Sequence, residues 1–159
     1  MPISPQPKVY VETSILSYLA ARPSRDPITE GRQVITRRWW ENERHKYVLT
    51  VSEAVEVECG QGDPEMVSRR RIFMEEAALF PVHETMLRVA KLLIVPGAIP
   101  EKAGVDAVHI AAAAVEGCDF LLTWNFRHIA NVRIRREVER ILANHGYDKT
   151  TICTPEELF

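Results

Sequence analysis

Oxygen-bearing side chains stand at four well-separated points of this 159-residue chain, Glu12, Glu58, Asp106 and Asn125. Asp106 is the most unusual, because it lies inside the otherwise apolar stretch 105–115. A buried carboxylate is costly unless a partner or a metal compensates its charge. Neighbouring carboxylates stay ionised only when a cation lies among them, and an all-oxygen set suits Mg²⁺ or Mn²⁺. We therefore expect Glu12, Glu58 and Asp106 to be the ligands of a divalent metal.

The chemistry expected of such a site is hydrolysis of a phosphodiester by a water that the metal activates, with one carboxylate taking the proton. Asn125 would position the water or another metal-bound ligand. The sequence contains no GxSxG motif and no papain-like cysteine motif, so nothing indicates a covalent nucleophile. It also lacks GxGxxG and GxxxxGK[ST], which argues against a phosphate-binding glycine loop.

Several residues near these positions are candidates for contact with a nucleic-acid substrate. Trp124 could stack on a base, although a packing role is an equally good interpretation. Arg127 and His128 follow Asn125 closely and could contact phosphate. His109 follows Asp106 by three residues and therefore shares its helix face. For His109 we favour a core histidine with satisfied hydrogen bonds over a role in the site.

The elements that must position these residues alternate between strands and helices. Apolar and β-branched runs predict strands at 8–12, 47–51, 79–82, 120–123 and 151–153. Helical periodicity predicts helices at 15–21, 27–44, 53–58, 65–78, 84–95, 100–116 and 133–145. The expected boundary signals are N-caps at Thr13–Ser14, Asp26 and Ser52, a C-terminal Gly117, and a capping box at 154–157.

This alternation predicts a three-layer α/β/α domain with a central parallel sheet, formed by residues 1–159 as one unit. Ligands of such folds bind beyond the carboxyl ends of the strands. Glu12 ends the first strand, and Asn125 follows the strand at 120–123. The helix of Asp106 must run antiparallel to the strands, so its start faces the same edge. Topology alone therefore predicts that these side chains converge.

Composition sets limits on the partners. The net charge of -2 and a pI of about 6.2 indicate no global attraction to nucleic acid, so RNA binding would need a local basic patch. The helix at 133–145 offers either a phosphate-binding stripe or a solvated face, because its arginines alternate with Glu137 and Glu139. These arginines are Arg133, Arg135, Arg136 and Arg140.

The cysteines and the N-terminal segment suggest a cytoplasmic protein. Cys59, Cys118 and Cys153 are far apart and form no CxxC, which favours free thiols in a reducing compartment over a disulfide framework or a zinc site. Residues 1–8 are polar and proline-rich and lack the apolar region of a signal peptide. The apolar runs are too short for a membrane span.

Four pieces of the chain, taken in order, resemble the PIN-domain family and, within it, the VapC-like toxins of type II toxin–antitoxin systems. They are VYVETSILSYL at 9–19, SEAVEVECGQGDP at 52–64, DAVHIAAAA at 106–114 and LLTWNFRHI at 121–129. Each piece alone is weak, but together they cover nearly the whole chain. The resemblance implies a Rossmann-like fold, divalent-metal-dependent RNA cleavage, a homodimer and inhibition by an antitoxin protein.

Carried over residue by residue, the resemblance places Glu12 at the family's first acid, which is normally an aspartate. It places Glu58 at the second acid and Asp106 at the third. Asn125 stands where many members have a fourth acid. Thr13 or Ser14 would support the first ligand by hydrogen bonding and lie close enough to meet the substrate. This assigns the chain a metal-dependent endoribonuclease activity, with RNA and an antitoxin as partners.

Other interpretations of the same residues remain open. Asp106 could pair with an arginine or cap a helical turn, and Glu12 could accept N–H groups of the next helix. Glu58 could belong to a solvated acidic face with Glu53 and Glu56. The corresponding alternatives for the protein are a catalytically inactive PIN-like module that binds RNA or protein, and a metal-dependent phosphatase. Against the phosphatase, the first strand ends in Glu-Thr-Ser without an Asp-x-Asp.

Overall fold

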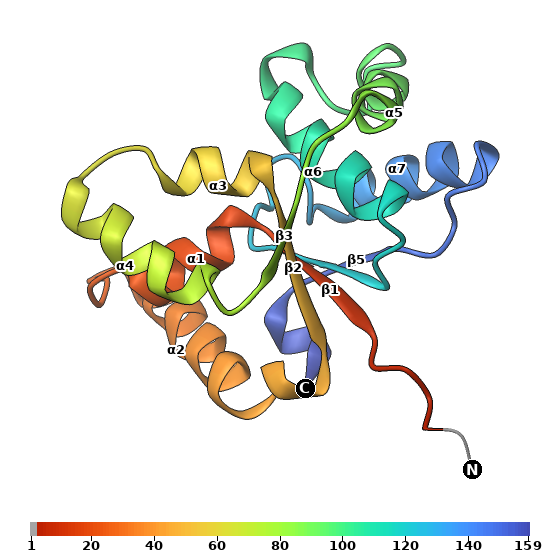
Figure 1. The fold of residues 1–159 in the computed structure, drawn as a ribbon. Coiled ribbons are helices and arrows are strands. Elements are labelled where there is room, and N and C mark those ends of the chain that lie inside the picture. The colour runs from red at the N-terminus through yellow and green to blue at the C-terminus, as the bar shows by residue number, and fades with distance from the viewer. Residues whose placement is uncertain (1–2) are drawn as a thin grey trace.

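The computed structural model of the protein describes residues 3–159, and Met1 and Pro2 of the proline-rich N-terminal segment lie outside the described residues. Strands and helices alternate along the chain (Figure 1). The strands are β1 (Lys8–Val11), β2 (Val48–Ser52), β3 (Ala78–Phe80), β4 (Phe120–Leu122) and β5 (Thr151–Cys153). The α-helices are α1 (Thr13–Ala20), α2 (Pro27–Asn42), α3 (Glu53–Cys59), α4 (Pro64–Met74), α5 (Glu84–Ile94), α6 (Gly104–Val115) and α7 (Val132–Asn144).

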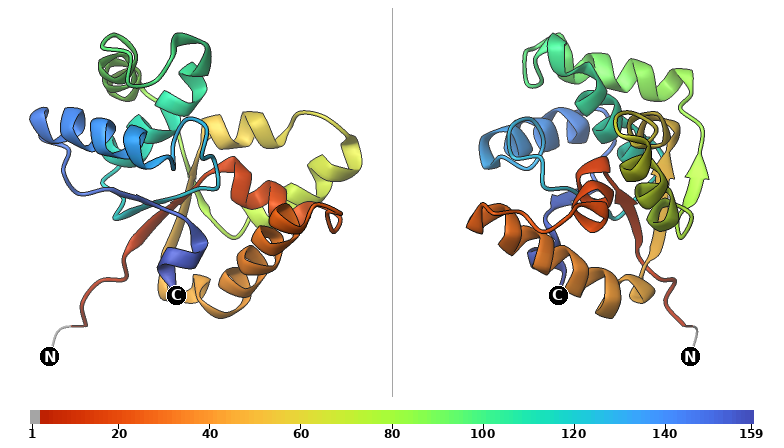
Figure 2. Two further views of the ribbon diagram at one scale, coloured as in Figure 1. Left: turned by 180° about the vertical axis from the view of Figure 1, so that it is seen from behind. Right: turned by 90° about the vertical axis from the view of Figure 1, so that its left-hand side faces the viewer.

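The strands form one parallel sheet in the order β3-β2-β1-β4-β5. Helices cover both faces: α1, α2 and α4 gather on one side, and α5, α6 and α7 on the other (Figures 1 and 2). This arrangement confirms the predicted three-layer α/β/α fold. Strand order reverses direction at β1, since the chain first moves outward through β2 and β3 and then returns to β4. Sheets of this kind bind ligands at that point, outside the carboxyl ends of the strands.

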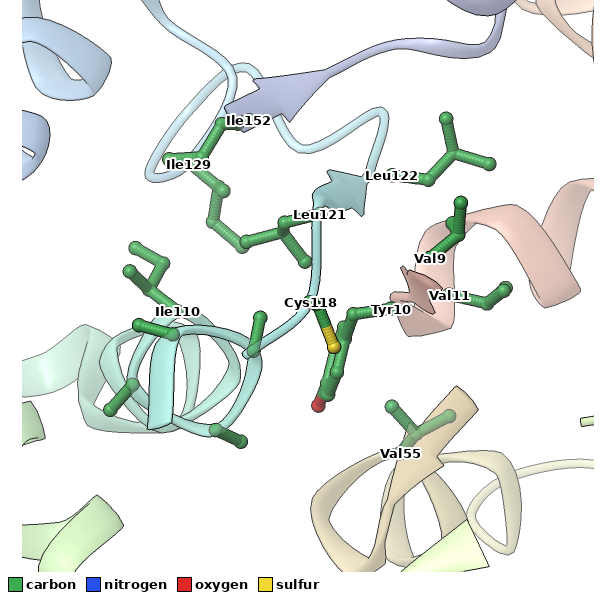
Figure 3. Packing of buried hydrophobic residues seen from close by; sticks show 14 of the residues in the cluster. Val9, Tyr10, Val11, Val55, Ile110, Cys118, Leu121, Leu122, Ile129 and Ile152 are labelled. Atoms are coloured by element: carbon green, nitrogen blue, oxygen red, sulfur yellow. The ribbon is translucent and has the colours of Figure 1, made fainter. Parts of the chain in front are cut away.

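The central strands are apolar on both faces, as parallel strands covered by helices must be. Val9, Tyr10 and Val11 are completely buried in β1. Figure 3 shows Tyr10 turned from β1 towards the helix that carries Ile110, with Val9 and Val11 on the other side. This alternation follows from the two-residue period of a strand. It sends the Tyr10 ring under α6, where its hydroxyl meets the polar residues described below.

Short-range signals set most helix boundaries. The Asp26 carboxylate accepts from Thr29 N, Ser52 Oγ accepts from Ala54 N, and the capping box at Thr154 is present ahead of the 3₁₀ turn Pro155–Leu158. Gly117 has a φ of +74° after α6, the left-handed position predicted for it. Three 3₁₀ turns are found among the described residues; the other two are Arg44–Lys46 and Glu101–Ala103.

Three predicted boundaries are wrong. The helix predicted from Pro100 begins at Gly104, after the 3₁₀ turn Glu101–Ala103. The predicted helix 65–78 ends at Met74, because Ala78 is drawn into the sheet opposite Thr50. The N-cap expected at Thr13–Ser14 is Glu12, whose carboxylate accepts from Ser14 N. The strand therefore ends at Val11, and Glu12 begins the turn into α1.

No helix in residues 3–159 is both long and apolar enough to cross a membrane.

Candidate functional site

The candidate site lies where β1 and β4 end, at the point where the strand order reverses. The backbone joins the two strand ends, since Glu12 N donates to the Leu122 carbonyl at 3.1 Å. The residues after β1 and after β4 are consequently neighbours, although 111 positions separate Glu12 from Thr123. The helix α6 begins at this edge and brings Asp106 and His109 on its first two turns.

Glu12 is buried, with 4% of its surface exposed, and its carboxylate is anchored by three donors. Oε2 accepts from Ser14 N at 2.9 Å, and Oε1 accepts from Ser14 Oγ at 2.6 Å. Thr123 Oγ1 also donates to Oε1, at 2.5 Å. A buried carboxylate needs hydrogen-bond donors for its oxygens, and these three groups supply them. Glu12 thus fastens the start of α1 to the end of β4.

Glu58 lies on the last turn of α3 and points to the same edge. Its Oε1 accepts from Thr13 Oγ1 at 2.6 Å and meets His109 Nε2 at 2.5 Å. Burial raises the pKa of Glu58, but the hydrogen bond and the charge of His109, with the Thr13 hydroxyl, more than offset this and lower the pKa below its usual value. Glu58 therefore carries a negative charge at neutral pH.

His109 is fully buried and hydrogen-bonded at both ring nitrogens. Nδ1 lies 2.7 Å from the Tyr10 hydroxyl, which in turn lies 2.7 Å from Ser52 Oγ. Burial lowers the pKa of His109, but the Glu58 hydrogen bond and the charges of Glu12, Glu58 and Asp106 outweigh it and raise the pKa. Burial raises the pKa of the Tyr10 hydroxyl, so it stays protonated.

Asp106 occupies the opposite side of the site and is also held by two partners. Asn125 Nδ2 donates to Oδ1 at 3.1 Å, and His128 Nδ1 lies 2.9 Å from Oδ2. The Asn125 side chain closes its own loop, because its Oδ1 accepts from His128 N at 3.0 Å. The loop after β4 thereby holds Asp106 in the way the strand ends hold Glu12.

The two halves of the site form one hydrogen-bonded unit. Thr123 Oγ1 donates to Glu12 and accepts from Asn125 N at 3.0 Å, which links the first acid to the residue that binds Asp106. One oxygen of Glu12 and one of Glu58 lie within 4.8 Å of each other and of a His109 nitrogen. Asp106 is not a member of this close set; it lies at the same edge through its position on the first turn of α6 and its contacts with Asn125 and His128.

This donor set fits a divalent cation. A carboxylate offers about four lone-pair positions, and the hydrogen bonds of Glu12 occupy three of them. Both hydrogen bonds of Glu58 go to Oε1, so Oε2 accepts none from residues 3–159. Asp106 accepts one bond on each oxygen. Each acid keeps a position for a cation, and carboxylate oxygens are the ligands that Mg²⁺ and Mn²⁺ prefer.

The structure changes the expected roles of the residues beside the acids. Of the two interpretations of Trp124, the structure supports packing and contradicts base stacking: Trp124 is 4% exposed and its Nε1 donates to Thr36 Oγ1 at 2.7 Å. The hydroxyls of Thr13 and Ser14 donate to Glu58 and Glu12, so they support the acids. Of the residues named as substrate contacts, Arg127 is exposed, and His128 is half-buried against Asp106.

Sequence reasoning missed the contacts that cross between elements. His109 was interpreted as a core histidine; it is buried as expected, yet it also touches Glu58. Its spacing of three residues from Asp106 was the available signal. Thr123 gave no signal, because an isolated threonine after a strand is common. Phe126, rather than Trp124, presents an exposed aromatic surface, with the Arg32 guanidinium 4.8 Å from its ring centre.

A cavity of about 390 Å³ adjoins Glu58 and lies between residues of α3 and α6. Its walls are mostly apolar, formed by Ala54, Val57, Val82, Val105 and Val108, with Glu53, Glu58 and Gln61 at its polar side. Apolar cavities with a few polar groups are typical of ligand sites. Glu58 thus belongs both to the acidic cluster and to the wall of an apolar depression.

No protein-family model matches the sequence, and no curated protein matches it at a significant level. Solved structures do match the fold. The Mycobacterium tuberculosis toxin VapC20, which cleaves the sarcin–ricin loop, superimposes with a TM-score of 0.58 at 18% identity, over 76% of this chain and 92% of that one. Rickettsia felis VapBC2, solved bound to a DNA fragment from its promoter, superimposes with a TM-score of 0.51 at 13% identity, over 92% of this chain and 97% of that one. This chain therefore has the fold of the VapC toxins, as the resemblance to PIN domains implied.

Proposed function

We propose that this protein is a divalent-metal-dependent endoribonuclease and the toxin of a toxin–antitoxin pair. The observation that carries the proposal is the cluster of Glu12, Glu58 and His109 at the point where the strand order reverses, with Asp106 on the first turn of α6 at the same edge. Carboxylates gathered at one place stay ionised together when a cation compensates their charge. The fold shared with VapC20, itself a toxin that cleaves RNA at the sarcin–ricin loop, supports RNA as the substrate.

The proposed roles follow from the contacts of each side chain. Glu12, Glu58 and Asp106 would hold Mg²⁺ or Mn²⁺, and the ion would polarise a phosphodiester and lower the pKa of a nearby water. One of the three carboxylates accepts the proton of the attacking water. Asn125 and His128 keep Asp106 in place, and the exposed Arg127 meets the phosphate backbone.

The proposal extends to the partners and the location of the protein. The neighbour VapBC2 is named as a complex of VapB and VapC, and this supports an antitoxin protein as the partner of this chain. We further infer a homodimer in the cytoplasm. Size-exclusion chromatography with light scattering, on the chain alone and on the chain co-expressed with an antitoxin, measures both assemblies.

The first experiment is thermal unfolding of wild type and Asp106→Asn, each with EDTA and with millimolar Mn²⁺. A ligand that binds only the native state adds about 2.7 kcal/mol at a hundred times its Kd. We expect Mn²⁺ to raise the wild-type midpoint, to raise that of Asp106→Asn much less, and the mutant to lose RNA cleavage. Glu56→Gln, an exposed acid on α3, is the matched control and should behave as wild type.

The two outcomes separate the candidate functions. If Mn²⁺ shifts neither protein, the acids are structural and the metal-dependent nuclease is wrong. If Mn²⁺ binds and RNA binds without cleavage, the protein is an inactive binding module instead. The phosphatase alternative is tested in the same samples, by release of inorganic phosphate from a 5′-phosphorylated nucleotide.

A further inference from the structure

A chain of hydrogen bonds begins at Glu58 in the acidic cluster and continues into the buried interior of the protein. It passes from Glu58 to His109, Tyr10 and Ser52, at 2.5, 2.7 and 2.7 Å, and ends at the N–H of Ala54. Its members come from α3, α6, β1 and β2. Buried polar networks of this kind hold their members in one geometry when every donor and acceptor is satisfied.

The donors and acceptors of this chain can be assigned. An ionised carboxylate only accepts, so the Glu58 contact requires a proton on His109 Nε2. When His109 is neutral, Nδ1 accepts from the Tyr10 hydroxyl and the Tyr10 oxygen accepts from the Ser52 hydroxyl; when His109 is protonated, both of these bonds run in the opposite direction. Ser52 Oγ accepts from Ala54 N at 3.2 Å. In both states the proton on His109 Nε2 is directed at Glu58 Oε1.

We propose that His109 is a positioning residue: braced by Tyr10, its Nε2–H holds Glu58 Oε1 so that Oε2 is presented to a divalent cation. This inference rests on the proposed function. Glu58 needs such support, because its long side chain is one-third exposed at the end of a short helix. Thr13 supplies a second donor to the same oxygen, at 2.6 Å. Two donors on Oε1 leave Oε2 as the atom available to the metal.

Burial argues that His109 stands behind the carboxylate and is not itself a ligand. None of its surface is exposed, and both nitrogens are already within hydrogen-bond distance of protein atoms. A cation at Nε2 would have to replace the proton that binds Glu58. Partners of metal ligands that act in this way are worth about 10–100-fold in metal affinity.

The test is Mn²⁺ affinity, measured from the EPR signal of free Mn²⁺ without any RNA. We expect wild type to bind, Glu58→Gln to lose binding, and His109→Leu to bind about 10–100-fold more weakly. His109→Gln places an amide N–H near the position of Nε2 and should recover most of the affinity. Tyr10→Phe removes only the brace and should show a smaller loss. His145→Leu, on an exposed histidine after α7, is the control for loss of a histidine.

A second readout needs no metal. In EDTA, proton NMR of wild type should show a downfield, slowly exchanging His109 Nε2–H, which disappears in His109→Gln and shifts upfield in Glu58→Gln. Circular dichroism and thermal unfolding establish that each variant is folded. If His109→Leu does not fold, Tyr10→Phe and His109→Gln test the inference instead. A Mn²⁺ affinity in Tyr10→Phe equal to that of wild type would then contradict it.

The outcomes distinguish this inference from the function on which it rests. If wild type binds no Mn²⁺, the proposed function fails and the inference with it. If wild type binds and His109→Leu binds equally well, only the positioning role fails. If ¹⁴N coupling to bound Mn²⁺ is seen in wild type and lost in His109→Leu, His109 is a direct ligand, and the positioning role is again wrong.

Discussion

At the scale of single residues, Glu12 combines two tasks. Its carboxylate caps α1 through Ser14 N and ties α1 to β4 through Thr123. Asparagine, aspartate, serine and threonine are the usual N-caps, since their short side chains reach the helix N–H groups directly. The extra methylene of a glutamate lets Glu12 cap the helix and also reach the hydroxyl of Thr123. A role in stability is thus built into the first acid of the site.

We expect Glu12→Gln to lower the free energy of unfolding by about 1–3 kcal/mol, because the new amide group turns a donor towards existing donors. Urea unfolding in EDTA measures this without any contribution from a metal. Glu56→Gln, exposed on α3, should change stability by less than about 0.5 kcal/mol. Equal midpoints for wild type and Glu12→Gln would show that the three hydrogen bonds do not hold the fold.

At the scale of elements, α6 carries two of the site residues, and its two ends are marked by glycines of different kinds. Gly104 begins the helix with φ -57°, a conformation open to any residue. Gly117 follows the helix at φ +74°, where a side chain is strained. Neither glycine has an atom within 4 Å of where a Cβ would stand, so only backbone conformation separates them. Comparing alanine substitutions at the two glycines therefore measures the free-energy cost of a side chain in the left-handed conformation that ends α6.

Gly117→Ala should destabilise the protein by about 1–2 kcal/mol, since alanine is strained in the left-handed region. Gly104→Ala should be neutral or stabilising by up to about 1 kcal/mol, through the reduced entropy of the unfolded chain. Thermal or urea unfolding of the two variants, compared with wild type, measures both effects. A similar loss in both variants would mean that space around α6, and not φ, determines the result.

At the scale of the whole molecule, a net charge of -2 and an acidic centre oppose RNA binding, so a local basic surface must overcome them. Helix α7 begins at the carboxyl edge of the sheet, directly after the loop that holds Asp106. Arg133 and Arg136 are exposed near its start and form no ion pair within residues 3–159. Arg135 and Arg140 are bound to Glu157 and Glu137. The predicted stripe is thereby reduced to two free arginines.

Arg136→Ala should weaken RNA binding and reduce the slope of log K against log salt by about 0.7, the value for one phosphate contact to a single strand. Arg140→Ala is the matched control, since its guanidinium already pairs with Glu137 at 2.6 Å and its loss should leave the slope nearly unchanged. Fluorescence anisotropy with a labelled RNA, on Asp106→Asn so that no cleavage occurs, measures both. Identical slopes for the two variants would remove α7 from the RNA-binding surface.

The sequence by itself determined the order of strands and helices, the parallel sheet and the edge at which the acids lie. These features depend on periodicity and capping, which act over a few residues and can be read locally. Asp26, Ser52 and Gly117 mark their helix ends as predicted. Topology then carried the argument further, because the start of a helix antiparallel to the strands must lie at their carboxyl edge.

Only the tertiary structure decided which polar groups meet. Glu58 and His109 are 51 positions apart, and Tyr10 and His109 are 99 apart. No local pattern encodes such a pairing, since it depends on how far each side chain reaches across packed elements. The same packing buried Trp124 and left Phe126 at the surface. Burial and hydrogen-bond partners belong to the assembled core, and they turn separate acids along the chain into one connected site.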